Sequence, residues 1–225
     1  MSDSPVRVAA VRRIGAAPRA AETDSDLVAA EEPLQLEIEH GPLHARRRLN
    51  AGVLLRTPGR DADLAAGLLF AEGFIAGRRD IQHIDMIEPG LLRVQLSAHV
   101  ELDGLASRRV LIRSSACGLC GRDAIDDLAG AGVPSVREGP AIPASLLRGL
   151  PGLLRARQTA FDETGGLHAA AFFDASGRLT SSAEDIGRHN AVDKLIGAAL
   201  LTRAPGSTGT TAPTEPAILL VSGRA

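Results

Sequence analysis

Alternation of apolar and polar residues predicts strands in the first half of the chain. Leu34, Leu36 and Ile38 alternate with Gln35, Glu37 and Glu39, which is the pattern of a strand with one buried face. Further short strands are expected at residues 53–56, 84–87, 91–96 and 110–113. Residues 1–30 show no clean periodicity, so we expect a mostly loose arm with at most a short strand around Val6 and Val8.

Helical spacing and capping residues predict the remaining elements. Asp61 can cap a helix that ends near Gly73, and a second helix is expected from Pro143 to about Phe161 with an interruption at Pro151. Other helices are expected at 123–129 and directly after 184–190. Strands are expected at 168–173, at 178–182 after a turn, and at 217–221, whose continuous apolar run is typical of a central strand.

This mixture of elements predicts an α/β (α+β) fold with three parts. They are a loose arm at 1–30, a β-rich domain at 31–105 and a layered αβ domain at 106–225. The chain stops just after the strand at 217–221, which is an unusual place for a natural terminus. We therefore expect the C-terminal part of the second domain to be missing.

Composition excludes several classes of partner. Aromatic residues make up 2% of the chain, with no Trp or Tyr, so there is little to stack on nucleic-acid bases. The formal net charge of −2 gives no basic field for nucleic acid or an anionic membrane, and no apolar run approaches 18 residues. Two cysteines close together do not make a secreted disulfide framework. We expect a cytoplasmic protein.

The pair Cys117 and Cys120 is the strongest candidate for chemistry. The Cys-x-x-Cys segment follows a predicted strand and precedes the predicted helix at 123–129, where helix N-terminal N–H groups favour a thiolate. The flanking glycines, Gly118 and Gly121, allow a tight turn, and the spacing brings the second thiol within reach of any group formed on the first.

Three chemistries fit such a pair: thiol–disulfide exchange, zinc binding and persulfide transfer. Thioredoxin-like motifs place an aromatic residue before the first cysteine, whereas this chain has Ala116. A structural zinc site needs four ligands, and a zinc deaminase needs His-x-Glu, whereas His168 is followed by two alanines. Persulfide transfer is favoured, and the other two stay open as a thiol–disulfide oxidoreductase or a zinc-binding cofactor-escort module.

Two glycine-punctuated segments could form a pocket for the sulfur acceptor. Gly165 and Gly166 allow close approach of backbone N–H groups to a ligand, and His168 follows at the start of a strand. Arg188 and Lys194, the single lysine of the chain, offer charge suited to phosphate. His189 and Asp193 lie one turn apart on a helix, so Asp193 could orient the imidazole. A plainer alternative is that Asp185 merely caps this helix.

The chain resembles the formate dehydrogenase accessory protein family (FdhD). The resemblance rests on motifs that occur in family order: EEPL at 31–34, TPG followed by LAAGLLFAEGFI within 57–75, SACGLCG at 115–121, TGGLHAAA at 164–171 and EDIGRHNAVDKLIG at 184–197. Members of this family continue beyond the Ser-Gly-Arg-Ala with which this chain ends.

The resemblance implies a function, partners and a fold. It implies a sulfurtransferase that receives persulfide sulfur on Cys117, with Cys120 as companion, from a cysteine desulfurase. The acceptor would be the molybdenum cofactor, bis-molybdopterin guanine dinucleotide, before its insertion into formate dehydrogenase. A cytidine-deaminase-like domain without zinc, a homodimer and no tightly bound metal are also expected. The residues expected to bind the cofactor are Gly165, Gly166, His168, Asp185, Arg188, His189, Asn190, Lys194, Ser222 and Gly223.

Overall fold

The structure of the chain is a computed structural model that describes residues 4–13, 22–102, 139–202 and 216–223. The predicted strand at 110–113, the predicted helix at 123–129, and both cysteines fall outside these residues. The elements in chain order are β1 (Val6–Arg13), β2 (Glu22–Ala29), β3 (Glu32–His40), β4 (Arg47–Arg56), α1 (Asp61–Ala71), the short 3-10 helix η1 (Arg78–Asp80), β5 (Ile81–Glu88), β6 (Leu91–Leu96), α3 (Ala144–Arg155), α4 (Thr159–Thr164), β7 (His168–Phe173), β8 (Leu179–Asp185), α5 (Arg188–Leu201) and β9 (Ile218–Val221).

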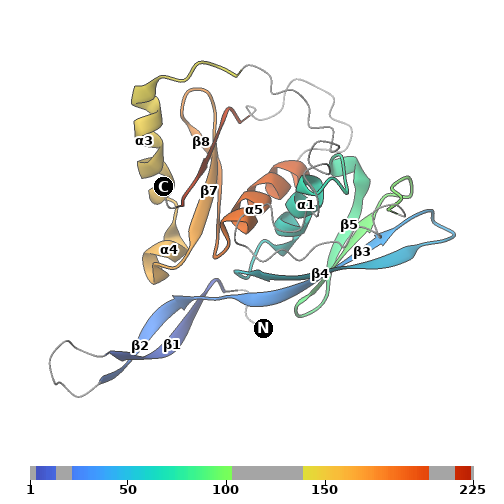
Figure 1. The fold of residues 1–225 in the computed structure, drawn as a ribbon, viewed down its shortest axis with the longest axis horizontal. Helices are drawn as coiled ribbons and strands as arrows, with labels where there is room; N and C mark the ends of the chain where they lie inside the picture. Colours follow the sequence, from blue (N-terminus) through green and yellow to red (C-terminus); the bar gives the residue numbers. More distant parts are fainter. Residues whose placement is uncertain (1–3, 14–21, 103–138, 203–215, 224–225) are drawn as a thin grey trace, which may run out of the picture.

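Two sheets enclose a pair of helices, which confirms the predicted mixed α/β class (Figure 1). The four-stranded sheet has the order β4-β3-β6-β5 and shares a hydrophobic core with α1. The three-stranded sheet has the order β8-β7-β9, with α5 packed on one face and α3 on the other. The helices α1 and α5 therefore form a middle layer between the two sheets.

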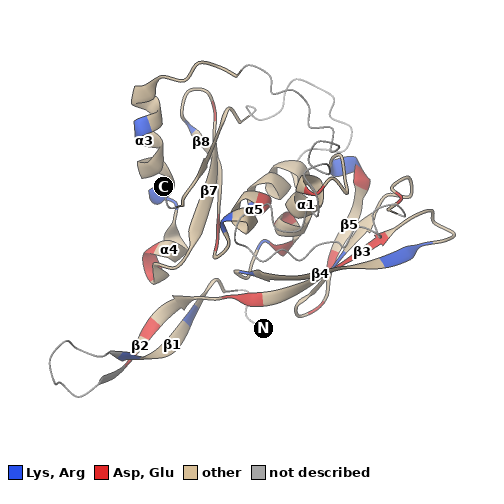
Figure 2. Cartoon of the chain, in the orientation of Figure 1, with Lys and Arg blue, Asp and Glu red and all other residues tan. Residues whose placement is uncertain are grey.

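The predicted strand in 34–39 is confirmed as part of β3, and its alternation sets the core of the larger sheet. Leu34, Leu36 and Ile38 are fully buried, whereas the residues between them are partly exposed. Burying a side chain of this size stabilises the folded protein by about 1.5–3 kcal/mol. The exposed face carries ion pairs instead, such as Arg93 with Glu37. Acidic and basic residues are interspersed over the ribbon in Figure 2.

The two middle helices touch at their backbones. A Cβ added to Gly67 of α1 would lie 1.9 Å from the carbonyl oxygen of Asp193 in α5. A Cβ added to Gly197 of α5 would lie 1.8 Å from the carbonyl oxygen of Asp63 in α1. Only glycine fits at either position. The helix from the predicted β-rich domain is thus packed directly on a helix from the predicted αβ domain.

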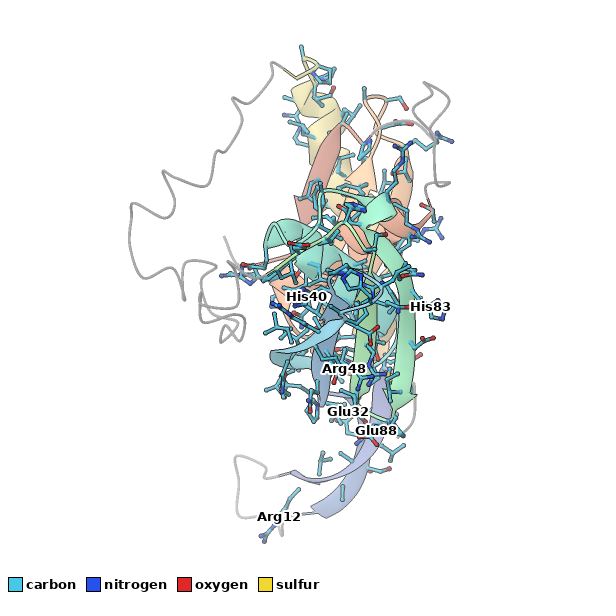
Figure 3. The ribbon with its side chains drawn as sticks, turned by 90° about the vertical axis from the view of Figure 1, so that its right-hand side faces the viewer. Arg12, Glu32, His40, Arg48, His83 and Glu88 are labelled. Atoms are coloured by element: carbon cyan, nitrogen blue, oxygen red, sulfur yellow. The ribbon has the colours of Figure 1, made fainter. Side chains whose placement is uncertain are left out.

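The N-terminal residues are more ordered than the predicted loose arm. In the described part they form a β1–β2 hairpin, paired from Val6 opposite Ala29 to Arg13 opposite Glu22. Figure 3 shows Arg12 far out on this hairpin and Glu32 where it meets the larger sheet. These residues show no apolar alternation because most of the hairpin side chains are exposed on both faces. The strands are ordered by their pairing with each other.

Two other predicted features differ from the structure. Pro151 lies inside α3 instead of interrupting it, and the helical path breaks between Arg155 and Thr159. Pro151 is on the exposed side, where the carbonyl that loses its partner can be hydrated. The strand β9, expected to be central, is at the edge of the described sheet, and Leu219 is 47% exposed. A continuous apolar run does not by itself distinguish these two positions.

We predict that Gly197→Ala destabilises the protein by about 3 kcal/mol or more, because the added methyl overlaps a backbone oxygen that cannot rotate away. Urea unfolding followed by circular dichroism measures the change. Gly149→Ala in α3 is the matched control, because its added Cβ meets no atom within 4 Å. That control should stabilise the helix by about 0.5–1 kcal/mol. Equal effects of the two substitutions would contradict the close helix contact.

Candidate functional site

The segments predicted to form a pocket meet at one end of the three-stranded sheet. There β7 begins at His168, β8 ends at Asp185 and β9 ends at Val221. His168 and Asp185 are direct partners in the β7–β8 register. Gly165 and Gly166 lead into β7, Ser222 and Gly223 follow β9, and α5 begins nearby at Arg188. Antiparallel pairing thus gathers ends that are up to 58 positions apart in the sequence.

His168 is held in a defined tautomer by the chain that follows β9. Its Nδ1 lies 3.2 Å from the carbonyl oxygen of Ser222. A carbonyl only accepts hydrogen bonds, so Nδ1 carries the proton and Nε2 of the neutral ring keeps a lone pair. Ser222 is itself fixed, since its Oγ accepts the N–H of Ala169 at 2.7 Å and its N–H donates to the Ala169 carbonyl at 2.7 Å.

The glycine turn before β7 uses its own N–H groups. Gly165 ends α4 with a left-handed φ of 66°, and its N–H donates to the Phe161 carbonyl. The N–H of Gly166 donates to Thr164 Oγ1 at 3.3 Å. Both N–H groups therefore have partners within the chain, while both glycines are exposed and leave the backbone open to a close neighbour.

Asp185 is a buried carboxylate whose two oxygens are both fully used by partners within the protein. It is fully buried and accepts four hydrogen bonds. Its Oδ2 accepts from Lys194 Nζ at 2.7 Å and from the Thr57 N–H at 3.2 Å. Its Oδ1 accepts from the Gly187 N–H at 2.9 Å and from Asn190 Nδ2 at 3.0 Å. We call Asp185, Lys194, Asn190 and Thr57 the buried lock.

The other members of the buried lock are also turned inward. Lys194 is 2% exposed and donates a second bond to the Thr57 carbonyl at 2.8 Å. Asn190 Nδ2 donates also to the Leu55 carbonyl at 2.8 Å. Sequence reasoning placed Asp185, Asn190 and Lys194 at a cofactor. The structure instead shows them bonded to one another and to the strand–helix loop, while Arg188 and His189 are exposed.

Thr57 is the residue that sequence reasoning missed. It lies in the TPG motif between β4 and α1, where the motif signalled a turn without suggesting a role. Besides its bonds to Asp185 and Lys194, its Oγ1 accepts the N–H of Ile186 at 2.9 Å. The start of this loop is fixed by a second buried ion pair, in which Arg56 donates to both carboxylate oxygens of Asp61 at 3.0 and 2.8 Å.

A small pocket of about 300 Å³ adjoins the buried lock. It lies between the loop at 57–60, residues 182–184 of β8 and the first turn of α4. Three cationic residues line it, namely Lys194 of the buried lock, Arg60 and Arg157. The Arg60 guanidinium already has partners, since it donates to the Ser182 carbonyl at 2.8 Å and to Asp63 at 2.8 Å. Arg157 also lines the pocket and is exposed. Glu184 accepts two N–H groups at the start of α4, which neutralises that helix end.

The sequence matches the FdhD/NarQ family over residues 29–225. The chain belongs to the FdhD/NarQ family. It is 42% identical over 210 residues to the sulfur carrier protein FdhD of Anaeromyxobacter dehalogenans, covering 89% of this chain and 69% of the relative. It is 37% identical over 217 residues to the protein of the same name from Streptomyces coelicolor, covering 92% and 72%. The family predicted from the motifs is thereby confirmed.

A solved structure shares the fold of this FdhD/NarQ family member. A crystal structure from Desulfotalea psychrophila, described as a formate dehydrogenase accessory protein, superposes with a TM-score of 0.63. It covers 98% of this chain and 76% of that one, with 19% sequence identity. In the part of the chain that the structure describes, no helix is both long and apolar enough to cross a membrane.

Asp193 does not make the predicted contact with His189. The described hydrogen bonds include none between these two side chains, since His189 is exposed and Asp193 is packed at the α1–α5 contact. Burial, together with the nearby negative charges of Glu72 and Asp185, raises the pKa of Asp193 to about 7. Asp193 therefore prefers the neutral acid in the folded protein.

We predict that breaking the buried lock is costly and that removing both charges is less so. Asp185→Asn or Lys194→Met alone should lower the free energy of unfolding by about 3–5 kcal/mol, because each leaves a buried charge unpaired. The double variant should be more stable than the sum of the single changes implies. Arg48→Ala, at an exposed pair with Glu39, is the control and should cost at most about 1 kcal/mol. Additive single effects in urea unfolding would refute the pairing.

We predict that this family member loses stability as pH rises from about 4 to 7. Folded Asp193 keeps its proton up to a pKa of about 7, whereas the unfolded chain releases it near its ordinary value. Proton uptake on folding therefore stabilises the protein at the acid end of this window. The pKa of Asp174 is lowered to about 2, chiefly by a hydrogen bond from Ser176, so it titrates outside the window. Asp193→Asn should flatten the dependence of Tm on pH, and an unchanged slope would count against this assignment.

Proposed function

We propose that the chain is a sulfur carrier that receives persulfide sulfur on Cys117 from a cysteine desulfurase. It then passes the sulfur to the molybdenum cofactor, bis-molybdopterin guanine dinucleotide, before insertion into formate dehydrogenase. The observation that carries this proposal is the 37–42% identity, over about nine-tenths of the chain, to relatives named sulfur carrier protein FdhD. The formate dehydrogenase accessory description of the matching crystal structure supports the destination of the sulfur.

The proposed transfer balances without an added oxidant. The Cys117 thiolate attacks the terminal sulfur of the desulfurase persulfide, forms the new S–S bond, and releases the desulfurase thiolate. Delivery as sulfide needs two electrons. The Cys120 thiolate supplies them by attacking the inner sulfur of the Cys117 persulfide, which leaves a Cys117–Cys120 disulfide and releases sulfide to the acceptor. The spacing of the two cysteines suits this second step.

The proposed acceptor site is the end of the three-stranded sheet. His168, Arg188 and His189 supply cationic or proton-accepting groups for the phosphorylated cofactor, with His168 Nε2 available as an acceptor. Gly165, Gly166, Ser222 and Gly223 provide backbone close to it. Asp185, Asn190 and Lys194 act from beneath by holding the start of α5. The N-terminus of the 14-residue helix α5 adds partial positive charge.

The proposal extends to a homodimer in the cytoplasm. The β1–β2 hairpin supports the dimer because it stands away from the body and exposes Val8 by 73% and Leu27 by 39% on the same face. A two-stranded ribbon is marginally stable in water by itself and gains from a covered apolar face.

We predict that incubation with a cysteine desulfurase and cysteine adds one sulfur atom to the intact mass, and that a reductant removes it. Cys117→Ala should abolish the addition because the accepting thiolate is gone. Cys120→Ala is the matched control and should keep the sulfur on Cys117, since the step that releases it is lost. An internal disulfide with no added sulfur would favour a thiol–disulfide oxidoreductase. Stoichiometric zinc on purification would favour a cofactor-escort module.

A further inference from the structure

The connection between β8 and α5 is two residues long, and side chains hold both of its N–H groups. The Ile186 N–H donates to Thr57 Oγ1 at 2.9 Å, and the Gly187 N–H donates to Asp185 Oδ1 at 2.9 Å. Arg188 begins α5 directly afterwards. The directions in which Arg188 and His189 leave the helix are therefore set by these two bonds.

Thr57 is placed to control this connection from outside it. It lies 129 positions earlier in the sequence, on the loop between β4 and α1, and is 2% exposed. Its N–H and its carbonyl are bonded to Asp185 and Lys194, so the residue cannot shift independently of the buried lock. Because both backbone groups of Thr57 are bonded, its hydroxyl is held in a fixed position relative to the Ile186 N–H.

We propose that Thr57 is a positioning residue, whose hydroxyl sets the start of α5 and so the placement of Arg188 and His189 toward the sulfur acceptor. This inference rests on the proposed function and assigns a role to a residue of the TPG motif. Thr57 itself is buried and does not touch the acceptor. Its hydroxyl acts because replacing it by a methyl leaves the Ile186 N–H without an acceptor in a partly buried place.

Two substitutions separate the hydroxyl from the shape of the side chain. Thr57→Val keeps the shape and removes the oxygen, whereas Thr57→Ser keeps the oxygen and removes a methyl. Thr180→Val is the matched control, because Thr180 Oγ1 also bonds across strands, to the Phe172 carbonyl at 3.0 Å, at the opposite end of β8. Circular dichroism and Tm establish that each variant is folded.

Hydrogen exchange measures the positioning directly. In Thr57→Val, the amides of residues 186–190 should exchange about tenfold faster or more, while Thr57→Ser and Thr180→Val should stay close to the wild type. Titration with GDP, which carries the guanine and phosphates of the proposed acceptor, should show binding weaker by about tenfold in Thr57→Val. Thr57→Ser should restore it, which a general loss of stability would not explain.

The outcomes separate this inference from the proposal on which it rests. If Thr57→Val binds GDP as tightly as the wild type, or if Thr57→Ser is as weak as Thr57→Val, the role of the hydroxyl is overturned. Unchanged exchange at 186–190 in Thr57→Val also overturns it, whatever the ligand result. If the wild-type chain neither acquires sulfur nor binds GDP, the proposed function fails, and with it the purpose assigned to Thr57.

Discussion

The buried ion pair between Asp185 and Lys194 is the constraint on which the described site depends. Moving two charges from water into the interior is expensive, and such a pair persists only where further hydrogen bonds satisfy both partners. Here Asp185 has four donors and Lys194 has two acceptors. Those partners come from β8, α5 and the loop at Thr57. The pair therefore fixes three segments at once. An apolar contact of the same size would not hold them in one geometry, because apolar contacts are not directional.

The ion pair works together with the close contact of α1 and α5. Gly67 and Gly197 let the two helix backbones meet, and this contact brings the loop before α1 against the start of α5. The hydrogen bonds to Thr57 then have partners within reach. Packing and polar bonding are consequently interdependent. A side chain at Gly197 would move the loop as well as the helix, and a broken lock would leave the loop to the bonds of Arg56 and Arg60.

The elements that could be predicted from the sequence are those with local signals. The alternation through Ile38 identified β3, and the apolar spacing after Asp61 identified α1. The predicted cap was wrong, because Asp61 is the first residue of α1 and Arg60 stands at the N-cap without a side-chain cap bond. The meeting of His168, Asp185 and Ser222 at one end of a sheet depends on the antiparallel order β8-β7-β9, which the strand assignments alone do not specify. The β1–β2 hairpin could not be predicted in this way. The register of β1 with β2 depends on pairing between the strands, and few of their side chains are buried.

The roles within the site were harder to predict than its location. Lys194 has a charge suited to phosphate, and no local pattern shows that it is 2% exposed and bonded to Thr57. Asp193 and His189 have the spacing of a helical pair, but the glycines that bring α1 close draw Asp193 into the contact. Both outcomes depend on segments far away in the sequence, since Lys194 bonds to Thr57, 137 positions earlier, and Asp193 packs against Gly67 of α1. Periodicity along one element cannot report which of its faces a distant neighbour covers.

One motif therefore divides into framework and contact residues by burial. Within 185–194, the polar groups of the buried lock bond to one another and to the neighbouring loop. They are the Asp185 carboxylate, the Asn190 amide and the Lys194 ammonium. The side chains of Arg188 and His189 are exposed, and Nδ1 of His168 bonds to the Ser222 carbonyl. Because Lys194 and Asp185 neutralise each other in the interior, this pair adds no net charge to the exposed start of α5. The position of the exposed start of α5 thus depends on an ion pair that lies beneath it.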